Sequence, residues 1–517
     1  MKFLRCVMVI RALSRFLVLE LVLVACLLPD VLALGGLVCG VDSSTQSVKV
    51  VIREARTGAL VREGRASHPP GTECDPQEWW TALQEALAQA GGLKDVGAIA
   101  VAGQQHGMVA LDTEGKVLRD ALLWNDVRSA DAAESLNQDI PNIHEVTGSR
   151  MVAAFTLAKV RWLADEEPEK AKRLGGLCLP HDWLSWKLLG GDASSDMSQL
   201  FTDRSDASGT GWLDLATSEH RHDLLDTALR LEAGTSRKTI ALPRVLSGKQ
   251  VGGTMPCGVK VACGAGDNAA AAFGLQVEEG DVVVSLGTSG TAFAVSKTPS
   301  RDPSGCVAGF AACGDSGAPF LPLVCTLNAA RNLDAAKQVL GCASFEELSE
   351  LALSSSPGSG GLSMLPYFEG ERAPNRPGAS GTLHGITLAN SNREDMARAY
   401  VEGVLCGLAD GVDALKRGGL LGVPVRRVVL IGGAARSEAV SQVASSVFGC
   451  EVVVPPPGEY VANGACRQAA WVLLGTDAPP QWGGSEYWGG DPQVVRSPPT
   501  PQVLAKYREL RDKTAGW

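Results

Sequence analysis

The chain has 517 residues, which is too long for one hydrophobic core and indicates about two or three domains. Hydrophobic residues make up 45% and charged residues 20%, so we expect most of the chain to fold. The formal net charge of -10 argues against nucleic acid or an anionic membrane as a partner, and an anionic ligand must be held by backbone N–H groups, metal ions or a few local cations.

The N-terminal segment, residues 1–35, differs from the rest. Basic residues precede an apolar run at 16–28, which is interrupted by Glu20. This order resembles a secretory signal, although the run is short for a membrane span of roughly 20 residues. Three interpretations stay open: a targeting or anchor segment, a start site placed too far upstream, and a dispensable extension.

Residues 36–54 read as a strand, a turn of small polar residues and a valine-rich returning strand. Asp75 and Pro76 then predict the start of a helix, because Asp is a good N-cap and Pro suits the first helical position. An apolar strand at 96–102 runs directly into G-Q-Q-H-G-M. These elements predict a domain that opens with a meander and continues as an α/β fold.

Helical and amphipathic sequence follows Trp124-Asn125-Asp126, as in 156–166. Residues 203–214, D-R-S-D-A-S-G-T-G-W-L-D, are turn-rich and polar, so we expect a loop at the mouth of a site. A strand near 259–262 then delivers the chain to G-A-G-D-N-A-A-A-A-F-G, where Asp267 stands between glycines and a helix-forming alanine run.

The second half begins with a hairpin whose turn spans 287–290, and a long helix at 393–417 is predicted with Asn392 as its cap. We then expect a strand at 427–431, a helix that ends at 448, a strand at 451–454 and a helix at 461–474. The halves resemble each other in this order, which predicts two similar α/β domains with a cleft between them. The predicted divisions are the extension 1–35, an N-terminal domain 36–276, a C-terminal domain 277–476 and a Pro/Gly-rich tail 477–517.

Two turns have the composition of phosphate-binding loops. They offer consecutive N–H groups and small hydroxyls, from Ser44 and Thr45 in the first and Gly287, Thr288 and Ser289 in the second. A turn of this kind, taken alone, is more often an ordinary hairpin. Asp42 ends the strand before the first turn, and a carboxylate beside a phosphate site is understandable if Mg²⁺ neutralises both.

Seven motifs in the same order resemble the FGGY family of carbohydrate kinases, over residues 37 to about 475. They are V-D-S-S-T-Q-S-V-K-V, A-G-Q-Q-H-G-M, L-W-N-D-V-R, S-D-A-S-G-T-G-W-L-D, G-A-G-D-N-A-A-A, S-L-G-T-S-G and L-I-G-G-A-A-R-S. The resemblance implies two actin-like ATPase domains of the ribonuclease H-like type, ATP and Mg²⁺ in the cleft between them, and phosphorylation of a sugar hydroxyl.

The resemblance also implies roles for residues on the sugar side. Asp267 matches the family's catalytic aspartate, and with an ordinary pKa near 3.9 it would be ionised and able to accept the hydroxyl proton. The alternative for this residue is a helix N-cap. The implied sugar-binding residues are Gln105, His106, Trp124, Asn125, Asp126 and Asn268.

On the nucleotide side the resemblance implies phosphate contacts from Ser44, Thr45, Gly287, Thr288 and Ser289. Adenosine contacts are implied for Gly433, Ala434 and Arg436, and a metal site for Asp42. Ser44 and Ala434 replace commoner glycines, and the added Cβ atoms could loosen nucleotide binding. Cys466 is unusual beside the nucleotide, and this position makes it a candidate for alkylation.

These residues lead to one hypothesis, ATP-dependent phosphorylation of D-xylulose at its C5 hydroxyl with Asp267 as base. The rivals are a related kinase for another ketose or polyol, and a nucleotide-binding switch of actin or Hsp70 architecture that phosphorylates no sugar. The expected partners are therefore a small sugar and ATP, with a homodimer possible, no nucleic acid, and no membrane unless residues 1–35 are retained as an anchor. ATP supply favours the cytoplasm, or an organelle lumen, over the exterior, and the apolar segment at 1–35 leaves an organellar or anchored location open.

Overall fold

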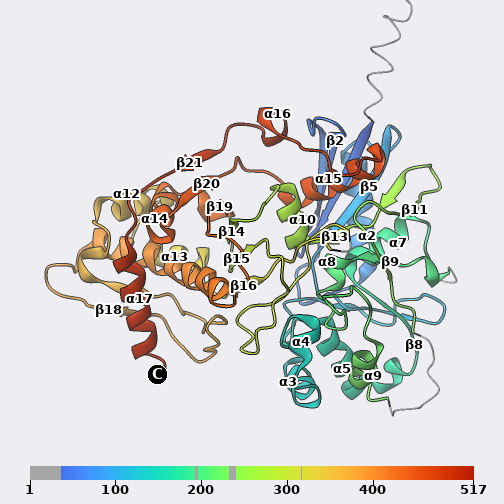
Figure 1. The fold of residues 1–517 in the computed structure, drawn as a ribbon, viewed down its shortest axis with the longest axis horizontal. Helices are drawn as coiled ribbons and strands as arrows, with labels where there is room; N and C mark the ends of the chain where they lie inside the picture. Colours follow the sequence, from blue (N-terminus) through green and yellow to red (C-terminus); the bar gives the residue numbers. More distant parts are fainter. Residues whose placement is uncertain (1–35, 193–195, 232–239, 316, 517) are drawn as a thin grey trace, which may run out of the picture.

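The computed structural model describes residues 36–192, 196–231, 240–315 and 317–516, and the predicted extension at 1–35 lies outside them. Figure 1 shows two α/β halves side by side, with α10 (Asp267–Gly274) between them. In the ranges described, no helix combines the length and the apolar character needed to cross a bilayer.

A seven-stranded sheet forms the centre of the N-terminal half. Its order is β11 (Val251–Thr254), β12 (Lys260–Ala262), β5 (Val96–Gly103), β1 (Leu37–Ser43), β2 (Ser47–Glu54) and β3 (Leu60–Ser67), with β13 (Ala265–Gly266) also paired to β5. Strands β1 and β2 form the predicted antiparallel hairpin, and β1 runs parallel to β5. Nearly every residue of β1 is buried, because helices cover both faces of the sheet.

Helices and short strands complete this half. The helices are α2 (Pro76–Gln89), α3 (Ala130–Asp139), α4 (Ile143–Thr147), α5 (Thr156–Glu166), α6 (Pro168–Ala171), α7 (Pro180–Leu188), α8 (Arg204–Ala207) and α9 (His222–Ala228). The short strands pair as β4 (Glu73–Cys74) with β7 (Ala121–Leu122), β6 (Val109–Asp112) with β8 (Leu174–Cys178), and β9 (Phe201–Asp203) with β10 (Arg244–Leu246).

A six-stranded sheet forms the centre of the C-terminal half. Its order is β16 (Leu323–Thr326), β15 (Gly290–Ala294), β14 (Asp281–Leu286), β19 (Arg427–Ile431), β20 (Glu451–Val454) and β21 (Gln493–Val495), and β17 (Ser363–Leu365) pairs with β18 (Thr382–His384) apart from it. The helices are α11 (Ala330–Val339), α12 (Phe345–Ser354), α13 (Arg393–Arg417), α14 (Glu438–Phe448), α15 (Tyr460–Leu474), α16 (Gly484–Trp488) and α17 (Pro501–Lys513).

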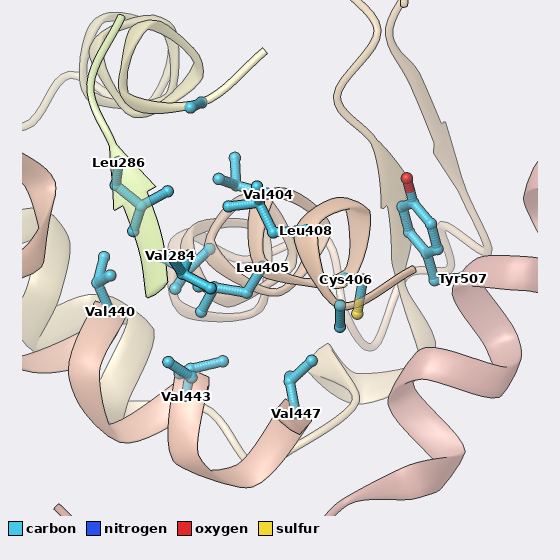
Figure 2. Close-up of a cluster of buried hydrophobic side chains, with 14 of the residues drawn as sticks. Val284, Leu286, Val404, Leu405, Cys406, Leu408, Val440, Val443, Val447 and Tyr507 are labelled. Carbon is cyan, nitrogen blue, oxygen red and sulfur yellow. The ribbon is translucent and has the colours of Figure 1, made fainter. Parts of the chain in front are cut away.

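Helix α13 lies at the centre of the C-terminal core. Figure 2 shows its apolar side chains between those of strand β14 and helix α14, and all of them belong to one buried cluster. The sequence predicted both ends of this helix, and the prediction is confirmed: the Asn392 side chain caps it by accepting from the Asp395 N–H. A buried helix of this length holds the sheet, and with it the turns at the strand ends, in a fixed position.

The polar stretch at 203–214 corrects a prediction. It was expected as a loop at the mouth of a site, but residues 201–213 are buried and include helix α8. The Asp203 carboxylate accepts from the N–H groups of Ser205 and Asp206, and the Asp206 carboxylate contacts His181 Nδ1 at 2.6 Å. The polarity of this stretch serves internal hydrogen bonds, so it did not indicate exposure.

Candidate active site

A cavity of about 770 Å³ opens between the two halves, and we call it the large cavity. Asp42 and Lys49 line it from strands β1 and β2, and Asp267 lines it from the start of α10. On the opposite side, Gly433 and Arg436 follow the end of strand β19. The site thus lies where parallel strands end, which is where open α/β sheets bind ligands.

A second cavity of about 280 Å³, the small cavity, lies next to it. Its lining includes Gln105, His106 and Trp124 from the N-terminal half and Ser289 from the C-terminal half. Asp267 and Asn268 line both cavities, so they form the boundary between the two.

Asp267 is the first residue of α10, and the N-cap is Gly266, so the N-cap alternative for this aspartate is wrong. Its Oδ1 accepts from the Asn268 N–H at 2.8 Å and from Asn268 Nδ2 at 3.1 Å. Burial, together with the negative charge of Asp42, raises the pKa of Asp267 to about 7. The ordinary pKa expected from the sequence is therefore corrected, and the carboxyl group titrates close to neutral pH.

Asp42 and Lys49 are directly opposite each other in the β1–β2 hairpin. Lys49 Nζ lies 3.2 Å from Asp42 Oδ2 and 2.8 Å from Glu459 Oε2 of the C-terminal half. Burial raises the pKa of Asp42, while the Lys49 charge opposes this shift. Asp42 Oδ1 is buried without a hydrogen-bond partner. Asp267 lines the same cavity, and an unpartnered carboxylate oxygen with a second carboxylate in the same lining fits the oxygen ligands that Mg²⁺ prefers.

The two predicted phosphate turns lie at strand ends, and of their predicted contact residues Ser289 lines the small cavity, whereas Ser44, Thr45, Gly287 and Thr288 are not among the described residues that line either cavity. Ser44 Oγ donates to Ser47 O at 2.8 Å and closes the first turn. Thr45 Oγ1 accepts from Trp124 Nε1 at 2.8 Å, so this turn is tied to the wall of the small cavity. In the second turn, residues 287–289 connect β14 to β15, with Thr288 exposed and the other two partly buried.

His106 has a left-handed backbone, with a φ of 67°, which is uncommon for a residue with a side chain. Its Nδ1 lies 2.7 Å from the Gly209 carbonyl and therefore donates to it, which leaves Nε2 as an acceptor when the ring is neutral. Burial, assisted by the charge of Lys159, lowers the pKa of His106 to about 3. A neutral ring with a free acceptor is suited to a sugar hydroxyl.

The surroundings of His106 combine polar and aromatic groups. Gln105 Nε2 donates to Ser205 O at 3.1 Å. The rings of Phe155 and Phe310 lie 4.8 and 5.7 Å from the His106 ring, and both residues line the small cavity. Apolar walls with a few fixed polar groups are typical of small-molecule sites.

Two predicted sugar-binding residues are not among the described residues that line the small cavity. Asn125 Nδ2 donates to Gly71 O at 3.3 Å. Asp126 is buried and accepts from Thr72 Oγ1 at 2.8 Å and from the Arg128 side chain at 2.9 Å. Both side chains hold the loop that carries Trp124.

The predicted adenosine turn is the short helix at Gly433–Arg436. Gly432 precedes it with a φ of +96°, and a Cβ there would lie 2.5 Å from Leu286 O, so the turn requires glycine. A Cβ on Gly433 would meet no protein atom within 4 Å, which leaves room for a flat ligand. Ala434 instead packs against the core of the C-terminal half and is not among the residues that line the large cavity.

Cys466 corrects another expectation. It is fully buried beneath the N-terminal sheet, where its Sγ donates to Val51 O at 3.2 Å. Burial raises the pKa of this thiol to about 12. Because reactivity requires an accessible thiolate, alkylation of Cys466 in the folded protein is not expected.

The sequence interpretation missed several lining residues. Lys49 could have been predicted from the sequence, because a hairpin with its turn at 44–46 places it opposite Asp42. Phe155, Phe310 and Arg372 enter the small cavity from segments far from the recognised motifs. No local pattern marks them, since only the folding of distant segments brings them together.

Comparison with known proteins gives matches over nearly the whole described fold. Models of the N-terminal and C-terminal domains of the FGGY family of carbohydrate kinases match residues 37–274 and 282–473. A xylulose kinase of Streptomyces coelicolor is 40% identical over 460 residues, covering 86% of this chain and 89% of the relative. A xylulose kinase of Escherichia coli is 34% identical over 450 residues, covering 83% and 89%.

Solved structures agree with this match. The crystal structure of xylulose kinase from Bifidobacterium adolescentis has a TM-score of 0.84 at 44% identity and covers 92% of this chain and 99% of that chain. The predicted fold, two α/β domains of the actin-like ATPase type with a cleft between them, is confirmed. The chain belongs to the FGGY family of carbohydrate kinases.

Proposed function

We propose that this kinase transfers the terminal phosphoryl group of ATP to the C5 hydroxyl of D-xylulose, giving D-xylulose 5-phosphate. The observation that carries the proposal is the position of Asp267 and Asn268 on the boundary between the large and small cavities. The large cavity has the volume and the glycine turn for a nucleotide, and the small one suits a five-carbon sugar. Relatives named xylulose kinase support the choice of sugar.

Asp267 is proposed as the general base. Its carboxylate orients the attacking hydroxyl and accepts the proton as the new O–P bond forms, while Asn268 holds Oδ1 through two hydrogen bonds. A pKa of about 7 suits this task, because a base titrating near the working pH is ionised in part and still accepts a proton readily.

Asp42 is proposed to hold Mg²⁺, with Asp267 nearby. When bound, the ion would neutralise charge on the transferred group and the phosphates. Lys49 supplies a further positive charge to the same cavity. Ser44, Thr45, Gly287, Thr288 and Ser289 are proposed to contact phosphates, and Gly433, Ala434 and Arg436 to lie along the adenosine. For Ala434 this contact would be through its backbone, since its side chain packs inward.

The mechanism predicts that Asp267→Asn loses sugar-dependent activity. Since asparagine is similar in shape but cannot accept the proton, we expect kcat to fall about 100-fold or more, with ATP binding retained. A coupled ADP assay gives kcat, and calorimetry gives ATP affinity. The matched control is Asp95→Asn, which removes an exposed carboxylate that pairs with Arg62 on the surface. Full sugar-dependent activity in Asp267→Asn would contradict the mechanism.

A sugar panel tests the substrate. D-xylulose should give the highest kcat/KM among ketoses and polyols in the same assay. A higher value for another sugar would point to a related kinase, and tight ATP binding with no stimulation by any sugar would favour a nucleotide-binding switch. The use of ATP supports a cytoplasmic location. The sequence left a homodimer open, and light scattering would test for one.

A further inference from the structure

One guanidinium reaches the small cavity from the C-terminal half. Arg372 lies between β17 and β18 and lines this cavity together with Gln105, His106 and Asp267. The predicted sugar-binding residues all come from the N-terminal half or from α10. Arg372 therefore adds to this cavity a charged group that comes from the other half of the protein.

The backbone of Arg372 is held firmly by its neighbour. Glu371 is only 2% exposed, and its Oε1 accepts from the Arg372 N–H at 2.7 Å and from the Leu327 N–H at 2.8 Å. Its Oε2 accepts from Asn328 Nδ2 at 3.1 Å. Leu327 and Asn328 directly follow strand β16, so a buried carboxylate fixes the position of Arg372 relative to the C-terminal sheet.

The Arg372 side chain, by contrast, has weak partners. Within the described ranges it forms no ion pair, and its Nη1 donates to Cys325 Sγ at 3.5 Å. Arg331 lies in the same half and pairs with Glu369 at 2.8 Å, while Arg150, also in the cavity lining, pairs with Glu134 at 3.4 Å. A thiol is a weak acceptor, so a ligand oxygen could replace it without breaking a salt bridge.

The groups on the two sides of the cavity are complementary. The neutral His106 ring offers an acceptor at Nε2, whereas the Arg372 guanidinium offers only donors in a planar fork. A polyol both donates and accepts through each hydroxyl, and neighbouring oxygens on a sugar have the spacing for a forked contact. A sugar is thus able to bridge His106 and Arg372.

We propose that Arg372 binds the acceptor sugar, donating hydrogen bonds from its guanidinium to neighbouring sugar oxygens. The proposal rests on the proposed function and extends it, because the sugar then contacts both halves of the protein. Sugar binding consequently favours closure of the cleft, which positions the hydroxyl for transfer.

Steady-state kinetics of Arg372→Ala and Arg372→Lys test this role. For Arg372→Ala we expect the KM for the sugar to rise about tenfold or more, since charged hydrogen bonds are lost. The KM for ATP and the sugar-independent ATP hydrolysis should stay within about twofold. Arg372→Lys keeps the charge but lacks the planar fork of donors. Its KM for the sugar should therefore lie between the values for the wild type and Arg372→Ala. The matched control, Arg331→Ala, removes an exposed arginine and should behave as the wild type.

The proposal is overturned if Arg372→Ala keeps the wild-type sugar KM, or if the KM values for sugar and ATP rise equally. Calorimetry gives a second measurement, the affinity for the sugar in the absence of ATP. This affinity should decrease from the wild type to Arg372→Lys and further to Arg372→Ala. An unaltered melting temperature excludes loss of folding. A failure of the proposed function gives a different result, because the wild type itself would then phosphorylate no sugar. That result would contradict both the proposed sugar kinase activity and the proposed role of Arg372.

Discussion

His106 concentrates several unusual properties in one residue. Its backbone is left-handed, its ring is held by the Gly209 carbonyl, and its own carbonyl accepts from Lys159 Nζ at 2.8 Å. Burial also lowers the pKa of Lys159 to about 7. A strained backbone conformation persists where the surrounding contacts hold the residue in place, and such residues are frequent at ligand sites. The residue therefore has one orientation and one protonation state available for a ligand.

The depressed pKa predicts how His106 responds to pH. The ring carbon signal of His106 in an NMR titration, assigned by its loss in His106→Gln, should not shift between pH 5 and 8. The folded state binds fewer protons than the unfolded state between a pKa of about 3 and the ordinary value of 6.5, so this residue lowers stability as the pH falls below 6.5. At pH 4.5 the neutral His106 ring lowers the free energy of unfolding by about 3 kcal/mol. A midpoint near 6.5 in the NMR titration would contradict the lowered pKa of His106.

At the scale of elements, the crossing of α10 and α15 connects the two halves. Helix α15 belongs to the C-terminal half by sequence, yet it packs on α10 and on strands β1 and β5 (Figure 1). Close approach depends on small residues. A Cβ on Gly464 would lie 1.9 Å from Ala270 O, and one on Gly40 would lie 2.0 Å from Ala462 O. The helix that carries Asp267 is thus positioned by contacts that leave no room for a side chain.

Gly464→Ala is expected to destabilise the protein by about 1 to 3 kcal/mol, because either helix must move to admit the methyl group. The melting temperature and the sugar kinetics should both change, since α10 begins at Asp267. Gly418→Ala serves as the control: its backbone φ is -71°, and the nearest atom to its Cβ would be 3.4 Å away. Equal melting temperatures for the two variants would contradict the packing argument.

At the scale of the whole molecule, the two halves are joined electrostatically across the large cavity. Lys49 of the N-terminal sheet contacts Asp42 in its own half and Glu459 at the start of α15. Four carboxylates line this cavity, those of Asp42, Asp267, Glu459 and Asp491, against two cations, Lys49 and Arg436. An anionic ligand therefore depends on these two cations or on a metal ion that it brings.

Lys49→Met tests this dependence. Removing the charge should raise the KM for ATP about tenfold or more, because a charge-assisted contact to phosphate is lost, while the KM for the sugar should change little. Lys116→Met is the control, since Lys116 is exposed and pairs only locally with Glu114. An unchanged KM for ATP would show that Lys49 serves only to join Asp42 and Glu459.

Local signals predicted much of the fold. The caps of Asp75 and Asn392 and the strand at Arg427–Ile431 depend on neighbouring residues, and all are as predicted. The order of motifs also indicated the family correctly. The polar stretch at 203–214 was misjudged, because composition does not reveal whether polar groups are satisfied by water or by each other.

The sequence by itself determined the family, the two-domain fold and the presence of Asp267 between a glycine turn and a helix. Only the tertiary structure decided the chemistry around it. The pKa of Asp267 depends on burial and on Asp42, which lies far away in sequence. Arg372 and Lys49 likewise reach their cavities through the packing of separate segments. Electrostatic interactions and cavities depend on distance in space, and the linear order of residues specifies that distance only after folding.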